Sequence, residues 1–339
     1  MKLALILVLC AGCPLPAQEN PKPLNRYQIV ELLVNGVPSP RVAILVGERG
    51  LDFAPTDQWL EITQVTGGDE ALITALRTAK VAAPLRAAAR QVAREETETA
   101  VEDLRDSLSK EPNNAGLHFV LGWVLTTQGK GDEALGELRE AQRLKADFAA
   151  THVLLGQAFV VKKDWDSAEK EYQEALRLKP DAVWTHVYYA TALRLQGDKA
   201  GAVKVMQEAV RLNPNDPDAH LQLGLRLMDV EDRDGAIGEY RKAESLRKDW
   251  YLPHQQLGRA LEAQQDLDGA LAEFRQAVRL RPEMPALHGQ LARLLERKGD
   301  RQGALDQYRQ ALQLAPDNPG LQRDVERLSR PAGRSGNRP

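Results

Sequence analysis

The feature that most constrains this chain is a 34-residue period in its alanines. Two series of six alanines keep this spacing. The first series is Ala134, Ala168, Ala202, Ala236, Ala270 and Ala304, and the second is Ala141, Ala175, Ala209, Ala243, Ala277 and Ala311. The period divides residues 115–318 into six repeats without insertion, numbered here as repeats 1 to 6: 115–148, 149–182, 183–216, 217–250, 251–284 and 285–318. Such a period predicts a stack of similar units, each of which buries its apolar faces against its neighbours.

The pattern within each repeat predicts two helices joined by a turn. Positions 8, 20 and 27 of the repeat are small, whereas positions 7, 11 and 24 are larger and mostly apolar. Small residues let two antiparallel helices approach closely, and the larger residues fill the space around them. Aspartate at position 16 of repeats 2 to 6 is placed to cap the second helix, and proline at position 32 of four repeats ends it. The pattern resembles the tetratricopeptide repeat (TPR), which implies an all-α fold, a right-handed α-solenoid of helix-turn-helix repeats.

Weaker matches flank the six repeats. Residues 81–114 fit the frame as a degenerate repeat that is complete in its second helix only, because Pro84 and Gln91 stand where the first helix needs packing residues. Residues 319–330 place apolar side chains at helical spacing and predict a helix that caps the last repeat. Residues 331–339 are rich in glycine, proline and arginine, and we expect a disordered tail there.

Residues 18–80 lie outside the repeats and are interpreted as a linker and a small helical segment. Start signals predict short helices that begin near Asn25, Ser39, Thr56 and Asp69. About 55 residues make a marginal core of their own. We therefore expect the segment to dock on the first repeats, with an independent binding module as the alternative.

The first residues have the features of an export signal. An apolar run follows Lys2 and is too short to span a membrane, which takes about 20 apolar residues. Two kinds of processing fit: residues 1–12 resemble a lipoprotein signal with Cys13 as the lipidated residue, or residues 1–17 form a signal peptide that is cleaved after Ala17. We expect export to the periplasm or cell envelope of a bacterium, either with a lipid anchor or in released form.

Composition and motifs argue against catalysis. A formal net charge of -3 gives no electrostatic footprint for nucleic acid or an anionic membrane. Both cysteines, Cys10 and Cys13, lie within the first 17 residues, which excludes a disulfide framework, a thiol nucleophile and a cysteine metal site from the folded part. The sequence has no phosphate-binding glycine loop, H-E-x-x-H or G-x-S-x-G motif. We expect no enzymatic activity, no cofactor, no nucleic-acid partner, and membrane contact only through the lipid anchor.

The six histidines all occupy position 4 of a repeat: His118, His152, His186, His220, His254 and His288. A shared metal ion would need several of these rings, but an intervening helix separates equivalent helices, which places the rings on the order of 10 Å apart. Zinc ligands lie about 2 Å from their ion. We therefore expect the histidines to pack between helices, and we predict no metal site.

The resemblance also implies a partner-binding groove, because the first helices of TPR arrays line a concave surface with positions 2, 5, 9 and 12. These positions carry nine apolar residues in repeats 1 to 4: Phe119, Trp123, Val153, Val160, Trp184, Val187, Leu221, Leu225 and Met228. They become polar from Gln255 onward. An exposed apolar surface of this extent marks an interaction site, with Trp123 and Trp184 as expected hot spots. The alternative is that the N-terminal segment or the degenerate repeat folds over this surface.

The basic clamp by which some TPR proteins hold an acidic C-terminal peptide is not implied. It needs lysine at position 5 and asparagine at position 9, and no repeat has this pair. An apolar groove favours an amphipathic helix or an extended apolar segment of a protein. We predict a non-enzymatic protein–protein interaction scaffold of the bacterial cell envelope. The alternatives are self-association through the ends of the array, and an enzyme or metal-binding protein that uses the histidines.

Overall fold

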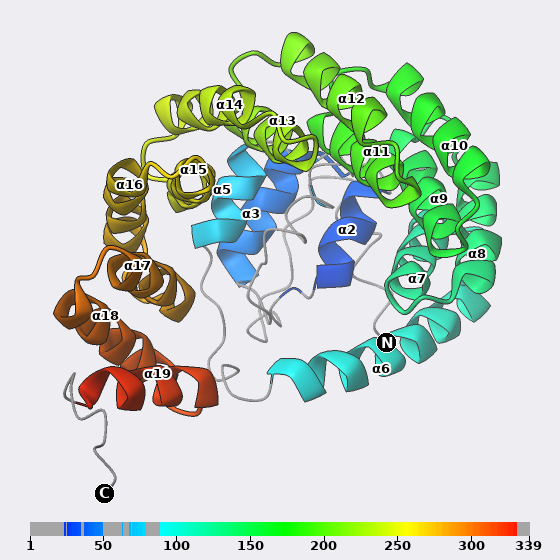
Figure 1. Ribbon diagram of the computed structural model, residues 1–339. Helices are drawn as coiled ribbons and strands as arrows, with labels where there is room; N and C mark the ends of the chain where they lie inside the picture. The colour runs from blue at the N-terminus through cyan, green and yellow to red at the C-terminus, as the bar shows by residue number, and fades with distance from the viewer. Residues whose placement is uncertain are drawn as a thin grey trace, which may run out of the picture. The chain divides into compact units, whose positions relative to one another are not determined.

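The computed structural model describes residues 24, 26–34, 37–49, 63, 68, 70–78 and 89–330. The chain divides into two compact parts, Met1–Val161 and Lys162–Pro339, called the N-terminal part and the C-terminal part below. Every element in the described residues is a helix, which confirms the all-α class (Figure 1). The predicted export signal with Cys13, the helix near Thr56 and the tail after Arg330 lie outside the described residues.

The N-terminal part contains three short helices followed by a long helix and the first repeat helices. Their bounds are α2 (Arg26–Val34), α3 (Ser39–Arg49), α5 (Glu70–Thr78), α6 (Ala89–Lys110), α7 (Ala115–Thr127), α8 (Gly131–Leu144) and α9 (Ala149–Val161). Helix α7 packs against α6 and α8, and α8 packs against α9. The three short helices begin within one residue of predicted start signals, at Asn25, Ser39 and Asp69.

The N-terminal segment docks on the first repeat. Helix α2 packs on α7, and apolar side chains of α2, α3 and α5 belong to the same buried cluster as those of α7 and α8. The ammonium of Lys145, at the end of α8, donates a hydrogen bond of 2.7 Å to the carbonyl oxygen of Val34, the last residue of α2. The segment thus gains the core that its short length cannot supply alone.

The degenerate repeat contains one long helix in the described residues. Helix α6 has 22 residues and includes Gln91, so the helix begins well before the point where a second helix of the repeat frame would start. It packs on α7 and covers the apolar face that would otherwise end the stack.

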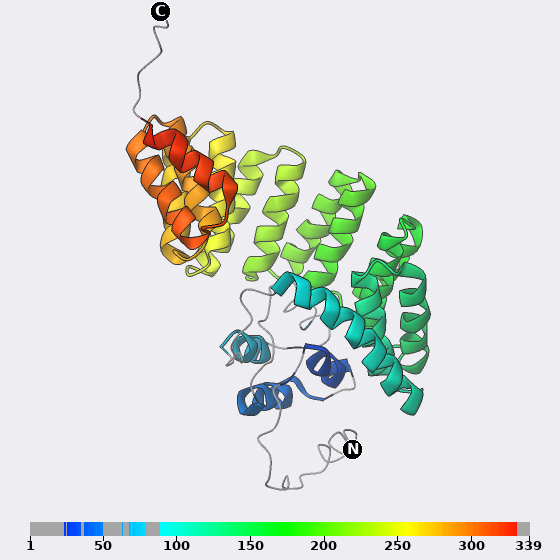
Figure 2. The same ribbon diagram turned by 90° about the horizontal axis from the view of Figure 1, so that it is seen from below.

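The C-terminal part holds the remaining repeat helices and the terminal helix. Their bounds are α10 (Trp165–Leu178), α11 (Val183–Gln196), α12 (Lys199–Leu212), α13 (Pro217–Asp229), α14 (Arg233–Leu246), α15 (Tyr251–Ala263), α16 (Leu267–Leu280), α17 (Pro285–Arg297), α18 (Arg301–Leu314) and α19 (Pro319–Ser329). Each helix packs on the next one in the chain. Within this part, α11, α13, α15 and α17 lie on one side of the stack and α12, α14, α16 and α18 on the other (Figure 1). Helix α19 lies against α18 at the C-terminal end of the stack (Figure 2).

Aspartates at position 16 fix the start of the second helices. Each carboxylate accepts a hydrogen bond from the backbone N–H three residues later, with distances of 3.2 Å for Asp164, 2.8 Å for Asp198, 3.0 Å for Asp232, and 2.9 Å for Asp266 and Asp300. These bonds satisfy an N–H group that has no partner inside the helix. The first helix of repeat 4 starts in the same way, where Asp216 accepts from the N–H of Ala219 at 2.9 Å.

Small residues at position 8 set the distance between the two helices of a repeat. A Cβ atom on Gly224 would lie 2.5 Å from Cε1 of Tyr240, and one on Gly258 would lie 3.0 Å from Cδ1 of Phe274. Both rings are buried, and Ala236, at position 20, has no exposed surface. The close approach that the alanine period predicts is therefore present.

Candidate partner-binding groove

The structure corrects the predicted groove in the N-terminal part. Phe119 and Val153 have no exposed surface, and Trp123 is 9% exposed. The ring of Phe119 packs edge-on against Phe148, with ring centroids 5.6 Å apart, and helix α2 covers α7. Phe119, Trp123 and Val153 are thus core residues. On α7, the surface predicted to bind a partner is covered by the N-terminal segment, which was the alternative interpretation. Val160, on α9, is half-buried.

In the C-terminal part, the predicted apolar residues come from two neighbouring helices. Trp184 and Val187 lie on α11, and Leu221, Leu225 and Met228 lie on α13, which packs beside α11. Leu221 is 4% exposed and belongs to the core, whereas the other four side chains are half-buried. The apolar section of the candidate groove is therefore Trp184, Val187, Leu225 and Met228.

A partly buried charge cluster stands beside this apolar section. Nη1 of Arg226 lies 3.3 Å from Oδ2 of Asp229, and Nε of Arg194 lies 3.9 Å from the same oxygen. These three atoms are buried and make no hydrogen bond to the described residues. Burial lowers the pKa of the Arg226 guanidinium, an effect that the charge of Asp229 opposes. Two guanidinium groups share one carboxylate, which leaves the cluster with a net positive charge.

The polar section of the groove contains a pocket of about 570 Å³. It is lined by Arg259, Glu262, Phe274, Gln290, Arg293, Glu296 and Arg297. Both glutamates are already paired: Glu262 binds Arg297, and Oε2 of Glu296 accepts a hydrogen bond of 2.9 Å from Nη2 of Arg327 on α19. The bonds to Arg327 hold the pKa of Glu296 below its ordinary value.

In the described part of the chain, Arg259 and Arg293 are the two positive charges of this pocket that are not paired with a carboxylate. Both side chains are exposed, and neither has an ion-pair or hydrogen-bond partner among the described residues. The sequence shows that the groove positions of repeats 5 and 6 become polar. It does not show that Arg297 and Arg327 neutralise the neighbouring Glu262 and Glu296. Unpaired guanidinium groups in a hollow are suited to a carboxylate, which they bind in a bidentate manner.

The histidines pack between helices, as expected. Five of the six are buried, and His118 is half-buried. In four repeats the Nδ1 atom of the histidine forms a hydrogen bond with a side-chain oxygen of the residue at position 23. The distances are 2.7 Å to Glu137, 2.6 Å to Glu239, 2.7 Å to Glu273 and 2.8 Å to Gln307. His152 lies near Gln142, with 3.5 Å between the two Nε2 atoms.

Two histidines at the same repeat position have opposite pKa shifts. Burial by itself would lower the pKa of His220, but hydrogen bonds to Glu239 and to the carbonyl of Pro214 raise it above the ordinary value. Position 23 of repeat 3 is Val205, so His186 has no carboxylate partner there. Its Nδ1 atom instead forms a hydrogen bond of 3.1 Å with the carbonyl oxygen of Ala182. Burial therefore lowers the pKa of His186.

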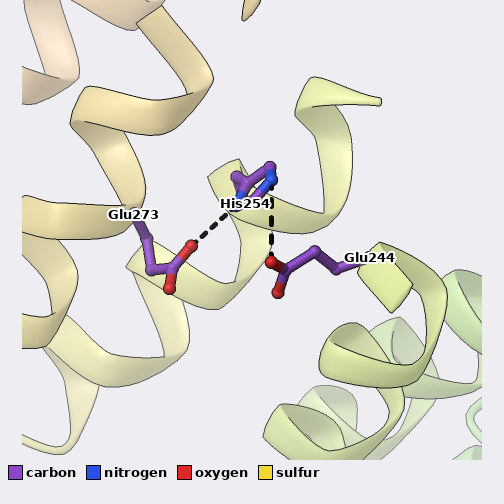
Figure 3. A group of neighbouring side chains, drawn as sticks. All are labelled: Glu244, His254 and Glu273. Atoms are coloured by element: carbon purple, nitrogen blue, oxygen red, sulfur yellow. Dashed lines mark hydrogen bonds and ion pairs between the residues drawn. The ribbon is translucent and has the colours of Figure 1, made fainter. Parts of the chain in front are cut away.

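The structure also brings one histidine together with two carboxylates. Atoms of Glu244, His254 and Glu273 that are able to bind a metal ion all lie within 4.8 Å of one another (Figure 3). Sequence reasoning missed this group because it compared the histidines with each other. The visible signal is Glu244, which stands at a repeat position that is otherwise leucine, valine or glutamine. As for membrane contact, none of the described helices combines the length and the apolar character of a membrane span.

Comparisons with known proteins agree with the repeat pattern. A family model for the tetratricopeptide repeat matches residues 85–147, 153–217 and 256–319, more than half of the chain. No curated protein sequence gives a significant match.

Among solved structures, the chain resembles the C-terminal part of a TPR repeat-containing protein from Cytophaga hutchinsonii. The two are 17% identical, the match covers 71% of this chain and 99% of that one, and the TM-score is 0.51. The chain also resembles the APC/C hetero-tetramer Cut9-Hcn1, with 16% identity, 90% of this chain and 53% of that one covered, and a TM-score of 0.50. At this identity the likeness supports the fold alone. Together with the family model, it shows that the chain belongs to the tetratricopeptide-repeat family.

Proposed function

We propose that this protein is an exported bacterial scaffold whose C-terminal part binds a segment of another protein along α11, α13, α15 and α17. The family supports the general role, because TPR arrays are protein–protein interaction scaffolds that bind proteins or peptides and are generally non-enzymatic. The groove position and the cellular location are the specific content of the proposal.

The observation that carries the proposal is the pair of unpaired arginines in the pocket. A cation that lacks a partner inside the protein is free to pair with one from outside, and the gain is greater in a hollow than on an open surface. Arg259 and Arg293 lie on α15 and α17, and α15 packs beside α13, which carries Leu225 and Met228.

The arrangement specifies the chemistry of the partner segment. We expect apolar side chains against Trp184, Val187, Leu225 and Met228, and at least one carboxylate against Arg259 and Arg293. An amphipathic helix or an extended segment with an acidic end has both features. The half-buried tryptophan supplies a large rigid surface and is the expected hot spot of the interface.

A cross-linked pull-down from native cells tests this groove with matched variants. Arg259→Glu with Arg293→Glu reverses the free charges, and Trp184→Glu with Leu225→Glu places charge in the apolar section. The control is Arg275→Glu with Arg279→Glu, which makes the same charge change at exposed positions of α16. Circular dichroism verifies that each variant keeps its helix content.

We expect a partner that wild type and control capture equally and that both groove variants lose. Identical capture by all four proteins would refute the groove as the binding surface and would move the search to the other side of the stack.

The proposed export has its support in the charged start and short apolar run before Cys13. The two forms differ in the mature N-terminus: a lipidated Cys13 anchors the protein in a membrane, whereas cleavage after Ala17 gives a free N-terminus at Gln18. Mass spectrometry of the mature protein from fractionated cells distinguishes them. Recovery of an uncleaved chain that begins with Met1 in the cytoplasm would refute both.

A further inference from the structure

We infer that Glu244 and His254 form a binding site for a divalent cation of the zinc type, with Glu273 as the group that orients the imidazole. The three residues come from three successive helices of the C-terminal part, α14, α15 and α16. Figure 3 shows the ring of His254 between the two carboxylates, which approach it from different sides.

Glu273 fixes which nitrogen of His254 is available. Its Oε2 atom lies 2.7 Å from Nδ1, so in the neutral ring the proton is on Nδ1 and donates to this carboxylate. The lone pair is then on Nε2. A carboxylate that accepts the second N–H of a histidine is the usual outer partner of a metal-binding imidazole, because it holds the ring in place and makes it more basic.

The Nε2 atom of His254 has no hydrogen-bond partner among the described residues, unlike the Nε2 atoms of His118, His220 and His288. In repeats 1, 4 and 6 the Nε2 atom forms a hydrogen bond with the carbonyl oxygen of a proline in the preceding turn. The distances are 3.0 Å to Pro112, 3.0 Å to Pro214 and 2.9 Å to Pro282. The residue in that place before His254 is Lys248, and no such bond forms. The His254 side chain is buried, at 4% exposed, and its Nε2 lone pair has no hydrogen-bond donor among the described residues.

A carboxylate faces this lone pair. Oε1 of Glu244 lies 4.0 Å from Nε2, beyond hydrogen-bond distance and close to the separation of two ligands on one ion. The equivalent residues in the other repeats are Gln142, Leu176, Val210, Val278 and Leu312. Within the repeats, only His254 therefore has a carboxylate at this place.

The donor set determines the kind of cation. One imidazole nitrogen and one carboxylate oxygen suit zinc and similar borderline metals, whereas magnesium and calcium prefer oxygen alone. An ion about 2 Å from each ligand needs only a small inward movement of Glu244, whose side chain is about one-third exposed. Water or a group of the bound partner completes the coordination. Such an ion joins repeat 4 to repeat 5.

Isothermal titration of the metal-free full-length chain with zinc chloride tests the site. Glu244→Val is the informative variant, because valine is the natural residue at this position in repeats 3 and 5. Glu326→Val, which removes an exposed carboxylate of α19, is the matched control. Since the variants share every other zinc-binding group of the chain, the difference between titrations reports this site alone.

We expect wild type and control to bind one more zinc ion than Glu244→Val, and zinc to raise the melting temperature of these two proteins more than that of the variant. Equal stoichiometry and affinity for wild type and Glu244→Val would overturn the proposal, as would the absence of zinc binding by wild type.

Glu273→Gln separates the positioning role from direct binding. A glutamine at this position still holds a histidine ring, as Gln307 does for His288 at 2.8 Å. We expect the variant to keep the melting temperature of the metal-free protein and to lose about tenfold or more in zinc affinity at this site. Unchanged zinc affinity would contradict the assignment of Glu273 as the orienting group.

Discussion

Replacement of Gly224 by alanine tests the close contact between the helices of a repeat. A Cβ atom at this position would lie 2.5 Å from Cε1 and 2.7 Å from Cδ1 of Tyr240, a ring that is 1% exposed. Gly238 offers a matched control in the next helix of the same repeat, because a Cβ atom there would have no neighbour within 4 Å. Both glycines lie inside helices, in α13 and α14.

The two substitutions share one contribution and differ in the other. Alanine favours a helix interior over glycine by about 1 kcal/mol, so Gly238→Ala is expected to raise the free energy of unfolding by up to that amount. Gly224→Ala has the same gain but must displace a buried ring, and overpacking of this kind costs about 1–3 kcal/mol. Repeat 6 carries Ala292 and Tyr308 at the equivalent positions, which places the cost toward the lower end of this range.

Urea unfolding followed by circular dichroism measures both variants against wild type. The common gain cancels in the comparison, so we expect Gly224→Ala to be less stable than Gly238→Ala by about 1–3 kcal/mol, with similar denaturant slopes. Exchange of Tyr240 for methionine, which repeat 3 carries opposite Ala190, should reduce the cost of Gly224→Ala. Gly224→Ala that is as stable as Gly238→Ala would refute the assigned contact.

Three further predictions concern the histidines, the caps and the alanine period. In an NMR titration of the ring protons, the pKa of His220 should lie above the ordinary histidine value of 6.5 and that of His186 below it. The stability that protonated His220 contributes is therefore complete below about pH 6.5 and is lost as the pH rises through its raised pKa. The reverse order of the two pKa values would contradict the role of Glu239. Asp266→Ala removes a cap bond of 2.9 Å and should lower the unfolding free energy by about 0.5–2 kcal/mol in urea denaturation. Ala236→Trp overfills a site with no exposed surface and should cost about 1–3 kcal/mol or more, and an unchanged melting temperature would contradict the repeat register.

Much of the fold was predictable because its determinants repeat within 34 residues. The period locates the helices, and the aspartates at position 16 cap them as expected. These features depend on neighbours along the chain. Periodicity therefore reports them directly.

The candidate site was less predictable because its determinants lie between distant segments. The burial of Phe119 depends on α2, which no repeat position encodes. The free charge of Arg259 depends on the pairing of Glu262 with Arg297 and of Glu296 with Arg327. Such preferences among several possible partners follow from side-chain packing in three dimensions, which a single sequence does not reveal.

Site-specific photo-cross-linking in native cells tests the central claim most directly. A photoreactive amino acid at Met228 lies in the apolar section of the groove, and one at Arg275 lies at an exposed position of α16 as the control. We expect a covalent adduct with one partner protein from Met228 and none from Arg275, and we expect Arg259→Glu with Arg293→Glu to abolish it. An adduct from Arg275 alone, or an adduct from Met228 that persists after both charge reversals, would contradict a groove that recognises its partner through these arginines.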